Sequence, residues 1–152
     1  FKRLVSENAS KIPITHEDMT RFWITLREGV EFVLDNFSRM HGGEIFLPKI
    51  PSVRVTDLAK AYAPNLPIEI IGIRPGEKLH EQMIGEEDAP FTYEYDHHYK
   101  ILPMIHDFYL DPKRIMNGRS VDSSFSYKSD SNSEWMTILK LRKWIENNYQ
   151  EI

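Results

Sequence analysis

The stretch Gly72-Ile-Arg-Pro-Gly-Glu-Lys-Leu-His-Glu81 places an arginine, a turn and a carboxylate in a row directly after an apolar segment. The apolar residues Ile68 to Ile73 predict a short strand, and Pro75-Gly76 predicts the tight turn that ends it. Residues Lys78 to Ile84 then predict a short helix. This order of elements puts Arg74 at the end of a strand.

Arg74 and Glu77 suit a diphosphate that is held beside a sugar hydroxyl. A guanidinium at a strand end can offer paired donors to phosphate oxygens, and a carboxylate one turn later can accept from a ribose or sugar hydroxyl. Taken alone, the same residues fit an ordinary strand-turn-helix with a surface ion pair equally well. The stretch is therefore a candidate anion site whose meaning depends on the rest of the chain.

Composition limits the classes of function. The chain has 152 residues, of which 41% are hydrophobic and 12% aromatic, enough for one folded core. Its formal net charge of -4 gives no basic field for a polyanion, so we expect neither a nucleic-acid partner nor binding to an anionic membrane surface. The absence of cysteine excludes disulfides, thiolate zinc sites and a cysteine nucleophile, and it fits a cytoplasmic protein. Any phosphate site must be local.

The apolar runs and the first residue of the chain indicate whether it spans a membrane, is secreted or is part of a longer protein. No apolar run approaches the length of a membrane span, and nothing resembles a signal peptide. The chain starts at Phe1 rather than at a methionine. We therefore expect it to be a piece of a longer protein.

Short strands and helices alternate along the chain, which indicates an α/β fold of modest size without internal repeats. The segment from Asp107 to Asn132 has weak periodicity and dense serines, so we expect it to be irregular or partly mobile. Outside it, the sequence predicts a helix end at 1–6, an extended piece at 12–14 and strands at 19–24, 44–47, 53–55 and 99–102.

Hydroxyl side chains mark the starts of the predicted helices. Thr25-Leu-Arg-Glu28 has the residues of a capping box. Thr56 can cap a helix from Asp57 to Tyr62, and Thr137 can cap the final helix. Behind the capping box, apolar residues recur at helical spacing at Leu26, Val30, Val33, Leu34 and Phe37. In the final helix, Met136 and Leu141 fit a hydrophobic staple, and the predicted buried stripe is Ile138, Leu141, Trp144 and Ile145.

Several common catalytic and cofactor signatures are missing. The chain has neither a Gly-x-Gly-x-x-Gly fingerprint nor a phosphate loop ending in Gly-Lys-Ser/Thr, so it cannot bind a dinucleotide in the usual way by itself. His80-Glu81 begins like a zinc-protease helix, but Ile84 stands where the second ligand is needed. His97 and His98 point to opposite faces of a strand, which favours a solvated pair over a metal site. We expect no metal site.

Arg21 is a second candidate anion contact. It lies in Met19-Thr-Arg-Phe-Trp-Ile-Thr25, among apolar neighbours that favour burial. An arginine in such a strand usually has a defined partner, which could be a ligand or a neighbouring acidic residue such as Asp18 or Glu17. The presence of Arg74 favours the ligand.

Several ordered motifs resemble the carboxyl-terminal part of the UDP-N-acetylglucosamine 4,6-dehydratases, and most closely the 5-inverting type of the pseudaminic acid pathway. The resemblance covers nearly the whole chain. The motifs that carry it are Met19-Thr-Arg-Phe-Trp-Ile-Thr25, His41-Gly-Gly-Glu-Ile-Phe46, Pro48-Lys-Ile-Pro51 with Thr56-Asp-Leu-Ala59, Gly72 to Glu81 and Phe125-Ser-Tyr-Lys-Ser-Asp-Ser-Asn-Ser-Glu-Trp135.

This resemblance implies an α/β fold, the carboxyl-terminal substrate-binding portion of an extended short-chain dehydrogenase/reductase whose NADP-binding Rossmann core is largely missing here. Residues 1–106 would form the nucleotide-sugar-binding portion, and residues 107–152 an irregular segment and helix of the same domain. In such enzymes the cofactor takes hydride from C4, water leaves across C5 and C6, and hydride returns at C6 with inversion at C5. The family's catalytic residues lie outside this chain, so we name none.

The resemblance also assigns residues and partners. Arg21 and Arg74 match the two arginines that contact the diphosphate, and Glu77 matches the carboxylate that holds the uridine ribose. Pro75 and Gly76 shape the turn, and Met19 and Thr20 line the nearby wall. The implied partner is a UDP-sugar, in a cytoplasmic homo-oligomer when full length, and the chain alone is expected to be inactive.

Two other hypotheses remain open at this point. A nucleotide-sugar epimerase or reductase of the same superfamily would use the same arginine-phosphate contacts, because these do not determine what happens at the sugar. A non-catalytic nucleotide-sugar-binding or oligomerisation module would have to fold alone, without the apolar contacts of a Rossmann domain.

Overall fold

The computed structural model describes residues 1–148, except the side chain of His106. By its internal contacts the chain forms two compact units, each assembled from segments that are far apart in the sequence. Unit 1 comprises Phe1–Trp23, Pro51–Glu81 and Ser129–Ile152, of which the last four residues lie outside the described part, and unit 2 comprises Ile24–Ile50 and Gln82–Lys128. The predicted boundary between residues 106 and 107 separates a nucleotide-sugar-binding portion from an irregular segment and helix, and does not refer to compact units. It stays a prediction.

One half of unit 1 is a parallel strand pair covered by helices. Strand β1 (Ile12–Ile14) pairs in parallel with β5 (Ile68–Ile70), with Ile12 opposite Ile68. Helices α1 (Lys2–Ser6) and α3 (Val55–Tyr62) contribute to the same core. The side chains of this core are Ile12, Ile14, Ala59 and Ala63, with Phe1, Leu4, Val55, Leu66 and Ile68 packed around them.

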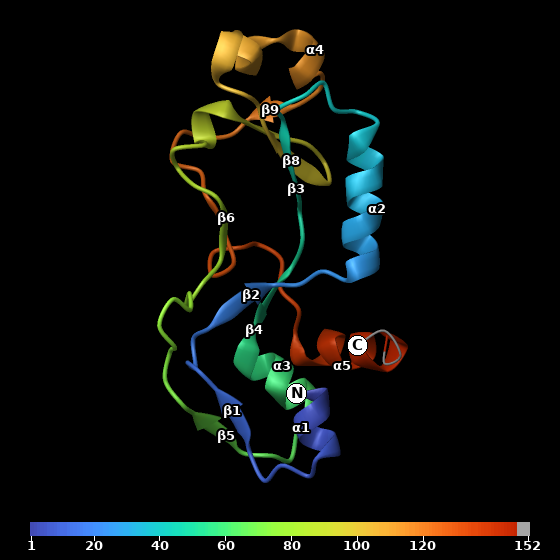
Figure 1. The fold of residues 1–152 in the computed structure, drawn as a ribbon, viewed down its shortest axis with the longest axis vertical. Coiled ribbons are helices and arrows are strands. Elements are labelled where there is room, and N and C mark those ends of the chain that lie inside the picture. The colour runs from blue at the N-terminus through green and yellow to red at the C-terminus, as the bar shows by residue number, and fades with distance from the viewer. Residues whose placement is uncertain (149–152) are drawn as a thin grey trace. The chain divides into compact units, whose positions relative to one another are not determined.

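The other half of unit 1 joins an antiparallel strand pair to the final helix. Strand β2 (Thr20–Phe22) pairs with β4 (Ser52–Arg54), with Arg21 opposite Val53. Helix α5 (Ile138–Asn148) packs against α3, as Figure 1 shows. Leu141 and Ile145 are buried, and the Trp144 ring meets Trp23 edge to face at 4.8 Å, which confirms the predicted buried stripe.

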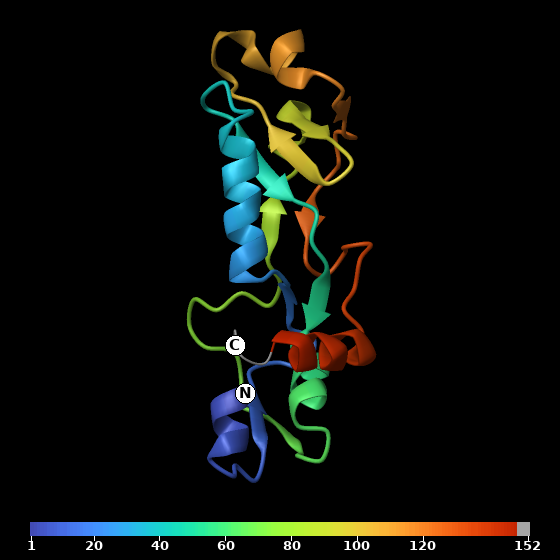
Figure 2. The same cartoon turned by 90° about the vertical axis from the view of Figure 1, so that its right-hand side faces the viewer.

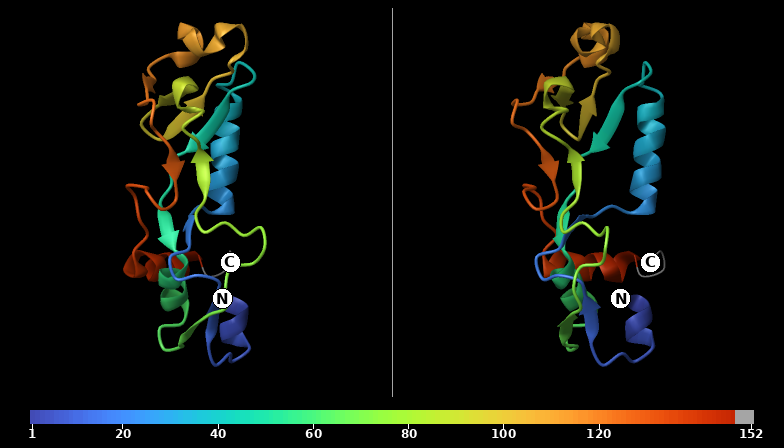
Figure 3. Two further views of the ribbon diagram at one scale, coloured as in Figure 1. Left: turned by 90° about the vertical axis from the view of Figure 1, so that its left-hand side faces the viewer. Right: turned by 60° about the vertical axis from the view of Figure 1, so that its left-hand side comes forward.

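Unit 2 contains a four-stranded antiparallel sheet. Its strand order is β3-β8-β7-β9, with bounds Ile45–Pro48, His98–Ile101, Thr92–Glu94 and Arg119–Ser120. A separate antiparallel pair joins β6 (Gln82–Ile84) to β10 (Tyr127–Lys128), as the left panel of Figure 3 shows. The other short elements are the 3-10 helices η1 (Ala89–Phe91) and η2 (Ile105–Leu110) and helix α4 (Pro112–Ile115).

A buried cluster of charged side chains joins the loop before β3 to α4. Arg114 Nη1 donates to Glu44 Oε1 at 2.7 Å, and the two side chains are 10% and 1% exposed. Lys100 Nζ donates to the Arg114 carbonyl at 2.7 Å, and burial lowers the pKa of Lys100. These bonds satisfy charges that would otherwise be costly inside a protein.

Helix α2 (Leu26–Phe37) forms as its capping box predicts. Thr25 Oγ1 accepts from the Glu28 backbone N–H, and the Glu28 carboxylate accepts from the Thr25 N–H. In Figure 2 the helix runs beside β3, and the Phe32 ring meets the His98 ring of β8.

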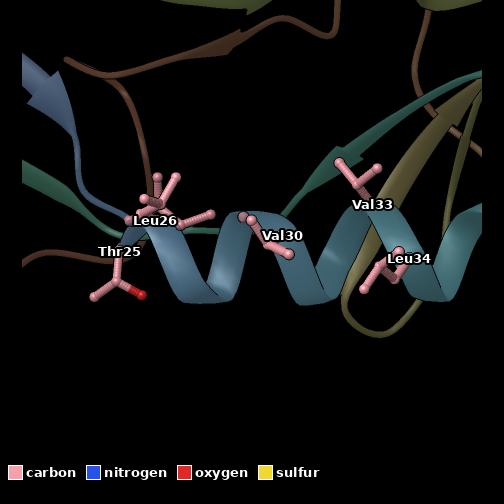
Figure 4. A pocket seen from close by; sticks show the side chains of 7 residues that line it. Thr25, Leu26, Val30, Val33 and Leu34 are labelled. Atoms are coloured by element: carbon pink, nitrogen blue, oxygen red, sulfur yellow. The ribbon is translucent and has the colours of Figure 1, made fainter.

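The apolar side of α2 is exposed in the part of the chain that the structure describes. Exposed fractions are 86% for Leu26, 50% for Val30, 63% for Val33, 66% for Leu34 and 74% for Phe37. Figure 4 shows four of these side chains, Leu26, Val30, Val33 and Leu34, along the helix. They line an apolar groove of about 520 Å³.

Three local predictions were wrong. Residues 78–84 form no helix, because the Leu79 carbonyl accepts from the Thr20 N–H and Gln82–Ile84 pairs with β10 instead of bonding within its own segment. Strand β5 ends at Ile70 rather than Ile73, since Gly72 takes a φ of +87°, which extended backbone does not allow. Thr56 lies inside α3, whose N-cap is Arg54 and has no side-chain capping bond.

Within residues 1–148, the structure has no helix of a length and apolarity that could cross a membrane.

Candidate functional site

Arg21 lies in the middle of β2 and is anchored on its neighbours. Its Nη1 donates to the Thr20 carbonyl at 2.7 Å and to the Leu79 carbonyl at 3.2 Å. Its Nε lies 3.7 Å from Oε1 of Glu81, and the Arg21 side chain is 27% exposed. The partner of Arg21 in this structure is therefore Glu81, rather than the nearby Asp18 or Glu17. The guanidinium is held at the junction of β2 with the end of the Gly72 to Glu81 stretch.

Two buried hydroxyl groups and a half-buried imidazole hold the same junction together. Thr20 Oγ1 lies 2.7 Å from Ser129 Oγ and 2.8 Å from His80 Nδ1, both hydrogen-bond distances. Ser129 Oγ also accepts from the Glu81 backbone N–H at 2.8 Å. Because Thr20 is 4% exposed and Ser129 is 0% exposed, these bonds are shielded from water.

Met19, next to Thr20 in the chain, is a buried side chain. It is 3% exposed, and its Sδ accepts from Thr15 Oγ1 at 3.2 Å. Met19 and Thr20 are therefore buried supports in this chain. Their predicted place along the wall of a ligand site stays a prediction.

Arg74 and Glu77 close a tight turn on each other. The Glu77 N–H donates to the Arg74 carbonyl at 3.0 Å, and the Arg74 N–H donates to Glu77 Oε2 at 3.2 Å. Between them, Gly76 takes a φ of +80°, which an L-residue with a side chain rarely adopts. The turn predicted for Pro75-Gly76 is confirmed. The Arg74 side chain is exposed, so its donors face solvent.

The structure brings some of the predicted residues together and not others. Arg21, Thr20 and Met19 share one strand region, and the Leu79 carbonyl joins Arg21 to the stretch that begins at Gly72. In the described part of the chain, no hydrogen bond or ion pair joins Arg21 to Arg74 or to Glu77. Their joint role at one diphosphate stays a prediction.

Three side chains of this junction were not predicted as site residues from the sequence: His80, Glu81 and Ser129. Glu81 ends the motif that drew attention to Arg74, so its carboxylate was a visible signal. Ser129 lies 109 residues from Thr20 in a serine-rich segment, where no local pattern distinguishes it from its neighbours.

Unit 2 holds a second group of polar and aromatic side chains around His98. The His98 and Tyr95 rings stack with centroids 4.5 Å apart and planes 1° apart. Burial lowers the pKa of His98 to about 4, and the positive charges of Lys100, Arg39 and Lys49 act in the same direction. Burial also raises the pKa of Tyr95 to about 12. His98 is therefore neutral at pH 7 and packed, while His97 is exposed.

Neither a metal nor a dinucleotide has a fitting site among the residues described. No group of three histidine or carboxylate side chains there is arranged to hold a metal ion. The glycine-rich turn that brings backbone N–H groups to a pyrophosphate is missing from the sequence, and Gly72 and Gly76 serve the turn around Arg74 instead. Residues 1–148 therefore lack the pyrophosphate-binding turn that NADP needs.

Comparison with known proteins identifies the family of this chain. The sequence profile of the polysaccharide biosynthesis proteins matches residues 1–103. The chain belongs to this family. The earlier resemblance is confirmed as well, because the inverting UDP-N-acetylglucosamine 4,6-dehydratase of Campylobacter jejuni serotype O:2 is 52% identical over 97% of the chain.

The chain is also similar to a protein whose name describes a different reaction. A UDP-glucose 4-epimerase of Rickettsia massiliae is 32% identical over 62% of this chain and 29% of its own length. Among solved structures, Pen from Bacillus thuringiensis superposes with a TM-score of 0.77 at 25% identity, over 97% of this chain and 42% of that one. This likeness confirms the predicted α/β fold class, part of an extended short-chain dehydrogenase/reductase. The chain spans 46% of the length of the Campylobacter dehydratase.

Proposed function

We propose that this chain forms the substrate-binding part of a UDP-N-acetylglucosamine 4,6-dehydratase of the inverting type. The observation that carries the proposal is the 52% identity to such an enzyme, which extends over 97% of the chain. The enzyme would be an NADP-dependent lyase that makes a UDP-4-keto-6-deoxy-L-hexose for a polysaccharide or flagellin glycan of the pseudaminic acid type. The chain alone would be inactive, because we assign its catalytic residues to the rest of a longer protein.

The role of this chain in the enzyme would be to hold the UDP portion of the substrate. Two arginines can neutralise a diphosphate, and each charge-assisted hydrogen bond contributes about 1.5–3 kcal/mol when shielded from water. Arg21 is already anchored by two carbonyls and a carboxylate, whereas the exposed Arg74 side chain is free to turn toward a ligand. Glu77 Oε2 is committed to its own turn, so we assign the uridine ribose to Oε1.

NADP would be held by the part of the enzyme that this chain does not contain. This assignment is supported by the missing glycine fingerprint and by the relatives, which are about twice as long as the chain. We also propose that the full-length enzyme is a cytoplasmic homo-oligomer.

The apolar side of α2 would pack on that same remaining part of the enzyme. A row of Leu, Val and Phe side chains that are 50% to 86% exposed is costly in water. The chain covers only 46% of the Campylobacter dehydratase, so a similar enzyme has ample residues to cover the face. The exposure of this face among residues 1–148 also argues against a freestanding binding module.

A second candidate is a nucleotide-sugar epimerase or reductase. The 32% identity to the Rickettsia UDP-glucose 4-epimerase favours it, but that match covers only 62% of this chain. The dehydratase match is both closer and longer.

Mass analysis of the product distinguishes these functions. The full-length protein would be incubated with UDP-N-acetylglucosamine, and we expect a product lighter than the substrate by one water. A new species of unchanged mass that separates from the substrate by chromatography would establish an epimerase, and bound substrate with no new species would establish a binding module.

A further inference from the structure

We propose that Glu81 is the positioning residue of Arg21, and that it orients the guanidinium for the diphosphate. The inference rests on the proposed function, because it assumes that Arg21 contacts the diphosphate. Glu81 itself would touch no substrate atom.

The Glu81 carboxylate bridges the backbone and the side chain of β2. Its Oε2 accepts from the Phe22 N–H at 2.9 Å, and its Oε1 lies 3.7 Å from Arg21 Nε. The bond to a backbone N–H fixes the position of the carboxylate, and the carboxylate then limits the rotamers of its neighbour Arg21.

The backbone of Glu81 is fixed in turn by Ser129. The Ser129 N–H donates to the Glu81 carbonyl at 2.8 Å, and the Glu81 N–H donates to Ser129 Oγ at 2.8 Å. Since Ser129 is 0% exposed and also hydrogen-bonds to Thr20, Glu81 is tied to β2 on both its backbone and its side chain. In binding sites, side chains that contact a ligand are commonly held in place by such hydrogen bonds from neighbouring residues.

These contacts leave one edge of Arg21 available. Nη1 is used by the two carbonyls and Nε faces Glu81, while Nη2 makes no hydrogen bond to any described residue. A guanidinium held in one orientation loses less freedom when it binds an anion than a mobile one does. Nη2 is therefore the group that we expect to donate to a phosphate oxygen.

Because Glu81 is negatively charged, electrostatics and positioning predict opposite changes in UDP affinity when the charge is removed. Removing a carboxylate near a diphosphate relieves repulsion and by itself strengthens binding. In Glu81→Gln the amide oxygen can keep the Phe22 N–H, and the NH2 group then faces the N–H of Arg21 Nε, so the orienting contact is lost. A net loss of affinity thus reports lost orientation.

The experiment titrates UDP and uridine into the full-length protein and its variants. We expect Glu81→Gln to bind UDP about five- to tenfold more weakly and uridine equally well, because uridine has no phosphate. Glu81→Asp, which keeps the charge, should recover part of the UDP affinity. The matched control is Glu69→Gln, since Glu69 is paired with Lys11 in the same unit and its side chain is also 42% exposed. This control should bind both ligands normally.

A double-mutant cycle with Arg21→Ala separates positioning from a general structural effect. In the Arg21→Ala background, Glu81→Gln should cause no further loss of UDP affinity, and the relieved repulsion should leave UDP binding equal or slightly stronger. Two results would overturn the positioning role alone. One is an equal loss of UDP and uridine affinity in both Glu81 variants. The other is an unchanged UDP affinity in Glu81→Gln while Arg21→Ala binds UDP more weakly. Unchanged UDP affinity in Arg21→Ala would instead remove Arg21 from the diphosphate site, and the positioning role with it.

Discussion

Arg114 Nη1 and Glu44 Oε1 form an ion pair at 2.7 Å in which the carboxylate is 1% exposed. The His41 backbone N–H also donates to both Glu44 oxygens, at 3.0 and 3.1 Å, and Arg114 Nη1 donates to the Gly42 carbonyl. The pair therefore ties the loop before β3 to α4, two segments that no local sequence pattern links.

Arg114→Ala should strongly destabilise the protein. The change leaves the Glu44 carboxylate buried without its cation, which typically costs about 3–5 kcal/mol in the free energy of unfolding. Urea unfolding measures this. The control is Arg119→Ala, because Arg119 is 74% exposed and lies 3.9 Å from Glu94 in the same unit, where an ion pair contributes at most about 1 kcal/mol. Equal effects of the two changes would contradict a structural role of the buried pair.

His98 should make stability depend on pH. Its pKa is about 4 in the folded protein, whereas the ordinary value, which applies to the unfolded chain, is 6.5. Between pH 4 and pH 6.5 the unfolded chain therefore binds more protons than the folded one. Stability therefore falls as pH drops from 6.5 to 4, by about 1–3 kcal/mol after allowance for solvent screening.

Unfolding of His98→Gln at several pH values tests this dependence. Carboxylates titrate equally in parent and variant, so the difference between them isolates His98. The slope between pH 4 and 6.5 should be shallower in His98→Gln than in the parent protein. A parental slope in His98→Gln would rule out His98 as its source.

Leu141→Ala should weaken the packing of α5 on α3. Leu141 is 0% exposed within the core of Val53, Ala61 and Ile145, and such truncations typically cost about 2–5 kcal/mol. Leu139 on the same helix is 77% exposed, so Leu139→Ala should leave the midpoint of thermal unfolding nearly unchanged. A small effect of Leu141→Ala would show that α5 contributes little to the fold.

Leu34→Ala tests whether the apolar side of α2 is covered in the full-length protein. Leu34 is 66% exposed in this chain, so covering it fully would make its loss cost about 1–3 kcal/mol. Arg27→Ala on the same helix, where Arg27 is 76% exposed and pairs with Glu31, serves as the comparison. If chemical denaturation shows no difference between Leu34→Ala and the parent, the face is solvated in the whole enzyme as well.

Elements with strong local signals could be predicted from the sequence. The capping box of Thr25 and Glu28, the turn at Gly76 and the buried stripe around Leu141 depend on residues that are near in sequence, and all three are confirmed. The helix at 78–84 failed because the backbone of this stretch bonds to β2 and β10, and propensity carries no information about such distant partners. Ser129 was missed for the same reason.

The candidate site also has a part that could be predicted from the sequence and a part that could not. The residue types and order around Arg21 and Arg74 indicated an anion site, and the similarity to a dehydratase agrees with that indication. The support by Glu81 and Ser129 required the structure, because it joins three segments of the chain. The convergence of the two arginines on one diphosphate remains the central prediction.

Titration of UDP into the full-length protein and its Arg74→Ala variant tests that prediction most directly. Loss of one or two charge-assisted bonds should weaken UDP binding by about ten- to hundredfold. Uridine affinity should stay the same, since Arg74 is assigned to the phosphates alone. Unchanged UDP affinity in a folded Arg74→Ala variant would contradict the account and remove Arg74 from the site.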